Sequence, residues 1–253
     1  MRYTIAACAL ATMSLLSCKD NKNKEEDNAS MNEPSAMEDT NTVSSDQEDW
    51  TVLFDGKNMD GWHAYNGDTP THWAIEDNAL VLTPAEDGSG SENLVTDKEY
   101  TDFVLSLDWK ISEGGNSGVI WAVEENKEYN EPYVTGPEIQ VLDNERHPDA
   151  KAGTTHQAGA LYDMVPPSEK VVNPAGEWNT MTFTIDHKKN MGNVTLNGTS
   201  IVDFPVKGEK WQEMVSKSKF ADWEHFAKSE TGKIALQDHH HKVSFRNIKI
   251  KEL

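Results

Sequence analysis

Large apolar residues alternate with mostly polar residues along residues 103–111, where Phe103, Leu105, Leu107 and Trp109 hold odd positions. Side chains two residues apart project from the same face of a strand, so this period predicts a strand with one buried face. Shorter segments of similar character recur between Gly, Pro, Asn and Asp residues, at 52–54, 73–82, 119–123, 138–143, 160–162, 180–187, 194–204, 233–239 and 243–251. The pattern predicts about a dozen strands in all.

The strongest turn signal is Asn197-Gly198, which separates two short apolar segments at 194–196 and 200–202. A type I′ turn needs positive φ at both central residues, which Asn and Gly adopt readily, so we expect a hairpin here. Residues 211–228 carry apolar residues at helical spacings, and Gly232 follows as a stop signal. We therefore expect one late helix over residues 211–228.

Many alternating strands, one late helix and no βαβ rhythm are typical of an all-β protein. The predicted fold class is an antiparallel two-sheet sandwich of jelly-roll type. The connections over residues 124–137 and 144–157 are long for a compact sandwich. Because long loops on a rigid scaffold commonly carry functional residues, we expect a site near these connections.

The first 49 residues have a different character from the rest. Residues 1–17 join one cation, Arg2, to an apolar run too short to span a bilayer, as in a signal peptide. The end of this run, Leu-Leu-Ser-Cys18, resembles a bacterial lipobox, in which Cys18 becomes the lipidated N-terminal residue. Residues 18–49 then form a disordered tether ahead of one folded domain over residues 50–253. We expect a lipoprotein anchored to the cell envelope, which meets the membrane only through its lipid; the alternative is a buried Cys18 thiol.

The chain of 253 residues carries 43 acidic side chains against 23 Lys and Arg, a net charge of −20. Phosphate binding depends on clustered cations, so this balance argues against nucleic acid as a partner. Cys8 lies in the predicted signal peptide, which leaves no pair for an internal disulfide. The fold must therefore be held by its apolar core.

Candidate chemistry is concentrated on two of the predicted strands. In the first, Ile139 and Val141 share one face, which leaves Glu138 and Gln140 on the opposite face. A β-bulge near Val141 would rotate Asp143 onto that polar face as well. The alternative is an ordinary amphipathic strand whose polar face is solvated.

In the second strand, residues 233–239, Gln237 and His239 share a face and offer an amide and an imidazole. His239 begins a run of three His residues that ends at His241. Three adjacent residues on a strand cannot all point to one ion, so this run alone makes a poor three-His metal site. No cofactor is assigned, and a divalent cation stays an open hypothesis.

Other positions add polar and aromatic groups to these strands. Asn116 lies in a Gly-rich segment that could hold a hydroxyl-rich ligand by close backbone approach, although a tight bend between strands has the same composition. His156 and Tyr162 flank a stretch of small residues and supply an imidazole and a phenol. Aromatic faces that could stack on sugars or pack in the core belong to Trp62, Trp73, Trp121 and Tyr133.

Eight segments, taken in order, resemble the 3-keto-disaccharide hydrolase domain family from Trp50 to Leu253. They are "LFDGKNMDGW", "GNSGVIW", "GPEIQVLD", "HQAGALYD", "GEWNTMTF", "LNG", "IALQDHH" and "VSFRNIKIK". The resemblance implies a concanavalin A-like jelly roll of the kind found in secreted and lipid-anchored proteins of Bacteroidetes-type bacteria. Two positions depart from the family pattern: Trp121 stands where Arg is common beside the cleft, and His240 stands where Gly is usual.

The resemblance also implies cleavage of glycosides that a partner oxidoreductase, acting upstream, has already oxidised at C3 of the sugar. A C3 ketone acidifies the C2 hydrogen, so a base can remove it, the C1 substituent can leave, and water can add to the enone. This chemistry needs a base, an acid, and donors for the enediolate oxygen. We expect Glu138 and His239 to share the roles of base and acid, in either order. The remaining candidates bind the oxidised sugar: Asn116, Gln140, Asp143, His156, Tyr162, Gln237 and Trp121, with Tyr162 assisting at the oxyanion.

Two other functions fit the same segments. Residues 138–143 have the spacing of the bulged Glu-x-Asp-x-x-Glu strand of laminarinase-like endoglucanases, although Gln140 replaces the central carboxylate. That mechanism needs two carboxyl groups about 5 to 5.5 Å apart, which here would be Glu138 and Asp143. The second alternative is a non-catalytic carbohydrate-binding lipoprotein, because the same sandwich also serves in lectins.

Overall fold

The computed structural model describes residues 49–85, 88 and 90–253. The chain divides into two units, residues 1–43 and 44–253, and every described residue belongs to the second. Cys18, the predicted signal peptide and almost all of the predicted tether lie outside the described residues. No helix among the described residues is both long enough and apolar enough to cross a bilayer.

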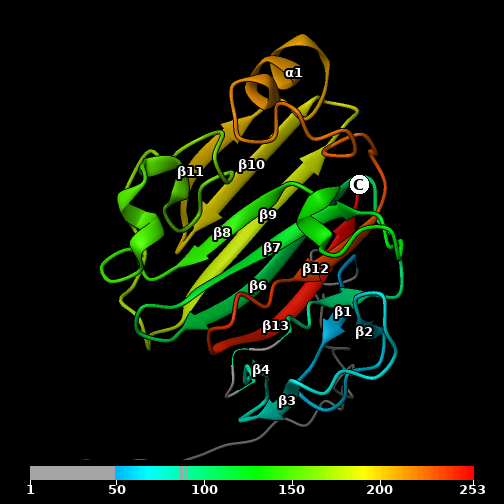
Figure 1. Cartoon of the computed structure of the whole chain (residues 1–253), viewed down its shortest axis with the longest axis vertical. Helices are drawn as coiled ribbons and strands as arrows, with labels where there is room; N and C mark the ends of the chain where they lie inside the picture. Colours follow the sequence, from blue (N-terminus) through cyan, green and yellow to red (C-terminus); the bar gives the residue numbers. More distant parts are fainter. Residues whose placement is uncertain (1–48, 86–87, 89) are drawn as a thin grey trace, which may run out of the picture. The chain divides into compact units, whose positions relative to one another are not determined.

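The described part folds into two antiparallel sheets, as predicted (Figure 1). The larger sheet runs in the order β11 (Thr199–Phe204), β10 (Met191–Leu196), β9 (Asn179–Asp186), β6 (Phe103–Ile111), β13 (Val243–Glu252), β4 (Ala79–Leu82) and β3 (Trp73–Glu76), and β1 (Thr51–Phe54) also pairs with β13. The smaller sheet runs in the order β2 (Trp62–Ala64), β5 (Leu94–Thr96), β12 (Lys233–Leu236), β7 (Asn116–Val123) and β8 (Glu138–Leu142).

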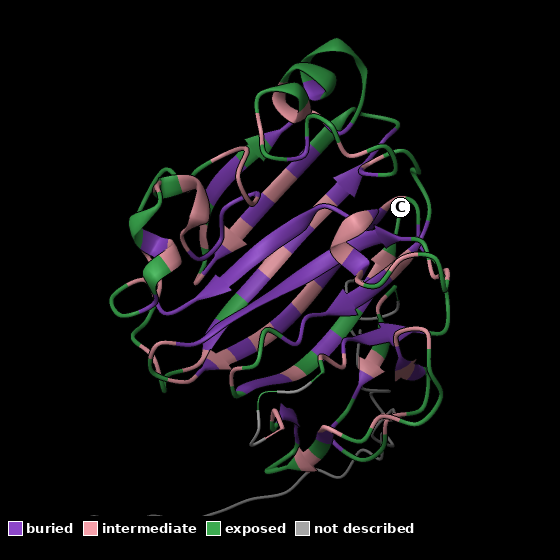
Figure 2. Cartoon of the chain, in the orientation of Figure 1, coloured by how far each residue is buried: buried purple, intermediate pink, exposed green. Residues whose placement is uncertain are grey.

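The core lies between the two sheets, as the alternation on β6 predicts. Every odd-numbered residue of β6 is buried and every even-numbered one is partly exposed. Phe183 on β9 links the two layers: its ring centroid lies 5.6 Å from that of Phe103 on β6 and 5.9 Å from that of Trp121 on β7. The predicted all-β sandwich is therefore confirmed, and Figure 2 shows the buried residues following the central strands.

The smaller sheet is buried on both of its faces. All residues of β7 and β8 are buried, including the polar positions that the sequence places away from the core. On the outer face, Val95, Ile120, Val123 and Ala235 of its strands form a second apolar cluster, and Tyr65 and Tyr133 pack against this cluster. The alternative of a solvated polar face on β8 is therefore wrong. The polar side chains of β8 are shielded from solvent.

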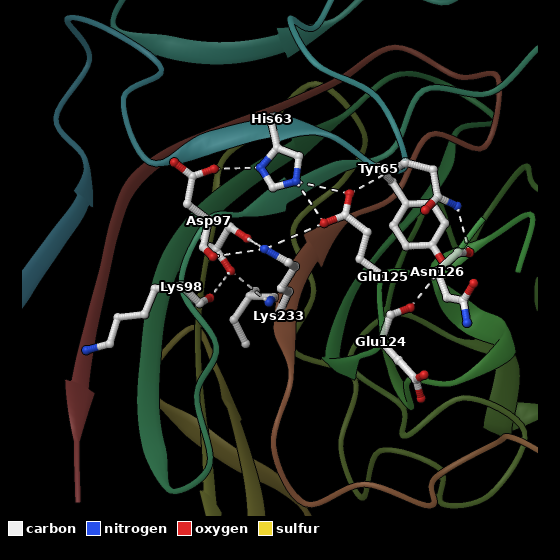
Figure 3. Close-up of polar contacts among 11 residues, drawn as sticks. His63, Tyr65, Asp97, Lys98, Glu124, Glu125, Asn126 and Lys233 are labelled. Atoms are coloured by element: carbon white, nitrogen blue, oxygen red, sulfur yellow. Dashed lines mark hydrogen bonds and ion pairs between the residues drawn. The ribbon is translucent and has the colours of Figure 1, made fainter. Parts of the chain in front are cut away.

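An ionic network joins the edge of the smaller sheet to the segment that follows β7 (Figure 3). The His63 ring lies between two carboxylates, with Nδ1 2.6 Å from Asp97 Oδ1 and Nε2 3.0 Å from both oxygens of Glu125. Lys233 Nζ lies 3.6 Å from Glu125 Oε2 and donates to the backbone oxygens of Thr96 and Asp97. These contacts fix β2, β5 and β12 to the start of the connection 124–137.

The predicted hairpin is confirmed, because Asn197 and Gly198 both have positive φ, 49° and 83°. The predicted helix is too long: α1 (Gly208–Ser216) starts before residue 211 and ends at residue 216, well short of residue 228. The reason lies in Ser218, whose hydroxyl donates to Val215 O and accepts from the Phe220 backbone N–H. A side chain that bonds the local backbone in this way competes with helical hydrogen bonding, so residues 217–228 turn away as a loop.

Residues 160–162 were expected to form a strand but make only isolated bridges, Leu161 pairing with Ile139 and Val165. They nevertheless run along the free edge of β8: Tyr162 N donates to Glu138 O at 3.0 Å and Gln140 N donates to Ala160 O at 3.1 Å. Three short 3-10 helices, η1 (Pro132–Val134), η2 (Pro148–Lys151) and η3 (Thr154–His156), lie in the long connections. The backbone of β8 is thereby joined to the loop that carries Tyr162.

Candidate active site

Two adjoining cavities lie over the outer face of β7 and β8, with volumes of about 290 and 410 Å³. They share Asn116, Tyr162 and His239. The first cavity is lined in addition by Tyr133, Glu138, Gln140, Lys219, Phe220, Trp223 and Gln237, and the second by His147, Pro148, Asp149 and Ala152. Most of the polar residues selected from the sequence therefore meet at one place.

Glu138 is the buried acid of the first cavity, with 7% of the residue exposed. Its side chain lies across Gly118 on β7, where a Cβ atom would come within 2.1 Å of Glu138 Oε1. Burial raises the pKa of Glu138 to about 8, and the Asp149 carboxylate adds to this, while the Lys219 ammonium and the Gln237 amide oppose it. A carboxyl group of this kind can hold or release a proton near neutral pH, as a general base or acid requires.

Three amides surround this acid. Gln237 Nε2 lies 3.5 Å from Glu138 Oε2, and Gln140 Nε2 lies 3.5 Å from Asp149 Oδ2. Asn116 is 4% exposed, and its Oδ1 atom has no hydrogen-bond partner. A buried acceptor without a partner is costly, so Asn116 Oδ1 is suited to accept a hydrogen bond from a ligand hydroxyl.

Tyr162 lines both cavities, and its hydroxyl group is held by a chain of hydrogen-bonded side chains. Its hydroxyl donates to Asp149 Oδ2 at 3.1 Å, and the other oxygen of Asp149 lies 2.8 Å from His156 Nδ1. His156 Nε2 lies 2.9 Å from Asp163 Oδ1, which completes a chain of four side chains. Burial, with the nearby carboxylates of Asp149 and Glu138, raises the pKa of Tyr162, so its phenol stays protonated at neutral pH.

Three imidazoles form a cluster beside the second cavity, and two of them, His147 and His239, line it. His147, His239 and His241 each offer a nitrogen atom, and these atoms lie within 4.8 Å of one another, so the cluster could hold a metal ion. His240 between them has a φ of +58° and is not part of the cluster, while His239 and His241 stack with ring centroids 5.8 Å apart. As expected, the run His239–His241 does not form the cluster alone. The third residue of the cluster, His147, comes from the connection 144–157.

The lone pair of one imidazole in this cluster already has a partner. His147 Nδ1 accepts a hydrogen bond from the Asp149 backbone N–H at 3.1 Å, so in the neutral ring the proton resides on Nε2. His241 Nδ1, in contrast, is buried without a partner. A metal ion would therefore have to displace the bond between Asp149 and His147 to gain all three nitrogen ligands.

Three residues assigned to substrate binding lie away from both cavity walls. Trp121 was expected beside the cleft but is 4% exposed and packs in the core against Phe183 and Phe204. Position 121 therefore faces the core and not these cavities. His156 lies behind Tyr162 and reaches the cavity only through Asp149.

Asp143 is the third of these residues. The pairing of β7 with β8 is continuous from Ile120 with Glu138 to Asn116 with Leu142, so the bulge considered near Val141 is absent from this pair. The Asp143 carboxylate instead accepts from Gly114 N at 2.7 Å and from Glu145 N at 3.0 Å, and it contacts Arg146. These bonds hold a loop, and they leave the two-carboxylate alternative without its second acid at the cavity.

Several cavity residues had no signal in the sequence. Lys219, Phe220 and Trp223 lie within the predicted helix 211–228 and instead form a cavity wall, with Lys219 Nζ 4.3 Å from the centre of the Tyr162 ring. Asp149 and His147 lie in a connection without periodicity, so only its length pointed to them. Of the four aromatic residues proposed as sugar platforms, Tyr133 lines the first cavity.

The covered face of this two-sheet sandwich holds a buried carboxyl group of raised pKa, amides and aromatic walls, an arrangement suited to a β-sandwich enzyme. The chain belongs to the family of 3-keto-alpha-glucoside-1,2-lyase-like domains, whose model matches residues 49–251. It is 33% identical to a 3-keto-disaccharide hydrolase of Bacteroides thetaiotaomicron, over 98% of this chain and 97% of that protein. The family and the enzyme class expected from the sequence are confirmed.

Solved structures agree with this assignment. A putative glycosyl hydrolase from Parabacteroides distasonis is similar with a TM-score of 0.75 and 34% identity, covering 84% of this chain and 99% of that one. A second putative glycosyl hydrolase from the same organism has a TM-score of 0.63 and 27% identity, covering 81% and 99%. The described fold is therefore that of its relatives over nearly their whole length.

Proposed function

We propose that this chain cleaves glycosides that carry a ketone at C3 of the sugar, and that Glu138 transfers the C2 proton. The observation that carries the proposal is the buried Glu138 carboxyl group, whose pKa is raised to about 8 in a cavity lined by amides and aromatic rings. The name of the relative, a 3-keto-disaccharide hydrolase, supports the same substrate class.

The reaction has two halves. Glu138 takes the proton from C2, which the neighbouring C3 ketone acidifies, and the electron pair forms an enediolate. The C1–O bond then breaks, its electron pair leaves with the oxygen, and an enone remains. The oxygen of a water molecule adds to C1, Glu138 returns its proton to C2, and the proton released by the water replaces the one that the departing oxygen takes up, which completes net hydrolysis. The base needs a pKa near the working pH, and burial gives Glu138 that property.

The cavity walls provide for a hydroxylated ring. Asn116, Gln140 and Gln237 supply amide donors and acceptors, and Tyr133 and Trp223 supply aromatic faces. His239 lines both cavities, and desolvation together with His241 and His147 lowers its pKa, so its ring is neutral at pH 7 and can both donate and accept. His239 thus remains a candidate for the second proton transfer. The substrate must come from an oxidoreductase that acts on C3 of glycosides.

The proposal is tested by incubating the protein with matched 3-keto-glycosides and unoxidised glycosides. Aglycone should be released only from the oxidised set, with transient enone absorbance. Glu138→Gln should lower kcat by about 10² to 10⁴, the usual contribution of a positioned proton-transfer group. Glu169→Gln, an exposed acid on a loop, is the matched control and should keep wild-type activity. Release from unoxidised glycosides would support a two-carboxylate glycosidase, and binding without release would support a carbohydrate-binding protein.

Deuterium at C2 gives the sharper measurement. Because the C2–H bond breaks in this mechanism, a C2-deuterated substrate should react more slowly in single-turnover experiments, and solvent deuterium should enter C2. Full aglycone release with no isotope effect and no exchange would rule out proton abstraction at C2.

A further inference from the structure

The chain of side chains behind Tyr162 is not needed for proton abstraction by Glu138, yet it ends at the cavity. It runs from Asp163 through His156 and Asp149 to the Tyr162 hydroxyl, with distances of 2.9, 2.8 and 3.1 Å. The His156 ring is held at both nitrogens, by Asp149 on one side and by Asp163 on the other. This arrangement fixes the Asp149 carboxylate, which in turn fixes the phenol.

Asp163 also orders the opposite wall of the cavity. Its second oxygen accepts the Lys219 backbone N–H at 2.6 Å, which anchors the loop that follows α1. The Lys219 ammonium then lies 4.3 Å from the centre of the Tyr162 ring. A cation at this place stabilises negative charge that develops on the phenol oxygen.

We infer that Tyr162 is the acid that protonates the departing C1 oxygen, and that Asp149, His156 and Asp163 are positioning residues that hold it. The inference rests on the proposed function and replaces His239 in the role of acid. The Tyr162 O–H proton moves to the C1 oxygen as the C1–O bond breaks. The phenolate, beside Lys219, then takes a proton from the water whose oxygen adds to C1, and the cycle closes.

The protonation state of Tyr162 fits this role. Its raised pKa keeps the phenol protonated until the transition state is reached. An alcohol leaves as a strongly basic alkoxide, which even a weak acid can protonate when it is held in place. The hydroxyl hydrogen can rotate from Asp149 toward the substrate without movement of the ring.

Leaving-group dependence tests the assignment. Tyr162→Phe should lower kcat by about 10² to 10⁴ on a 3-keto-glycoside with an alkyl alcohol as leaving group, the usual worth of a proton-transfer group. On the 4-nitrophenyl 3-keto-glycoside, whose leaving group needs no proton, the same variant should stay within a few-fold of wild type. His156→Gln should show the same dependence on the leaving group, with a smaller loss of kcat and an unchanged KM. Equal losses on both substrates would overturn the inference.

Proton exchange at C2 separates this inference from the proposed function. Tyr162→Phe should still exchange the C2 hydrogen of the alkyl substrate with deuterated solvent while it fails to release the alcohol. Glu138→Gln should lose exchange and release on both substrates; if it keeps them, the proposed function fails instead. A leaving-group-dependent loss in His239→Ala, without one in Tyr162→Phe, would return the acid role to His239.

Matched controls come from the network in Figure 3, which lines neither of the two cavities. The His63 ring also lies between two carboxylates, so His63→Gln reproduces the chemical change of His156→Gln. Tyr65, whose hydroxyl donates to Glu124 O at 3.1 Å, gives the control Tyr65→Phe. Both controls should show wild-type ratios of activity on the two substrates. Thermal unfolding of every variant checks that the fold is retained.

Discussion

Gly118 on β7 lies directly against the carboxyl group of Glu138 on β8. A Cβ atom at position 118 would lie 2.1 Å from Oε1 and 2.6 Å from Cδ of Glu138. Gly118 pairs with Gln140 in the sheet, so the Glu138 side chain leans along the strand to cover it. Because Gly118 has no side chain, the buried carboxyl group of Glu138 can occupy the space beside its Cα atom.

Gly118→Ala should therefore displace Glu138 and lower kcat on a 3-keto-glycoside by about 10², because small misplacements of a reacting group cost that much. Gly67→Ala is the control, since a Cβ there meets Ala64 at an ordinary 3.4 Å. Steady-state kinetics on both variants check the expectation. Full activity in Gly118→Ala would show that the position of this carboxyl group is not critical.

The stability of the domain should depend on Glu138 and on pH. Its pKa is raised from 4.5 to about 8 on folding, so the folded state binds the extra proton between these values. Stability from this group is complete below about pH 4.5, falls as pH rises to about 8, and is flat above that. At about 1.4 kcal/mol per pKa unit, the total is at most about 5 kcal/mol.

Glu138→Gln removes that proton and its pH dependence. The variant should unfold at a higher temperature than the wild type at pH 9, and the difference should shrink toward pH 4.5. Thermal unfolding followed across this range measures both curves. Parallel curves would mean that the buried carboxyl group has an ordinary pKa.

The three-His cluster should bind a divalent transition metal ion, such as Co²⁺, in the folded protein. His241→Ala should weaken binding at least about tenfold, because it removes one of three nitrogen ligands. His240→Gly is the control: it changes the adjacent residue and relieves a φ of +58°, so it should keep binding and slightly raise the unfolding temperature. Titration calorimetry and the visible spectrum of bound Co²⁺ measure the affinity. Equal affinity in the wild type, His241→Ala and His240→Gly would show that the cluster is not the metal site.

The predicted lipid anchor is tested by Cys18→Ala in the full chain. The variant should keep the activity of the domain but leave the membrane fraction, because acylation at Cys18 is the expected link to the envelope. Fractionation with immunoblotting and an activity assay measures both properties. A variant that stays with membranes would contradict the lipobox prediction.

Local pattern predicted most of the sandwich. Period-two alternation identified the buried face of β6, and Asn197-Gly198 identified the turn between β10 and β11, because both depend only on neighbouring residues. The same alternation placed Glu138 and Gln140 on one face of β8. It could not show that this face is covered, since Trp223 reaches it from a segment far along the chain.

The end of α1 shows where local reasoning failed. Residues 217–228 carry apolar side chains at helical spacing, yet Ser218 and the Asp163 carboxylate bind the backbone of this segment and turn it over the cavity. Asp163 is 56 residues away from Lys219, so no window on the sequence contains both partners.

The sequence by itself determined most of the strands, the hairpin, the family and the two catalytic candidates, because periodicity, turn chemistry and ordered motifs are properties of the chain. Only the tertiary structure decided which groups meet: Tyr162 beside Glu138 along the edge of β8, His156 behind it, His147 beside His241, and Trp121 in the core. The physical reason is that the raised pKa of Glu138 and the chain behind Tyr162 depend on burial and on contacts between distant segments, which arise when the sheets pack.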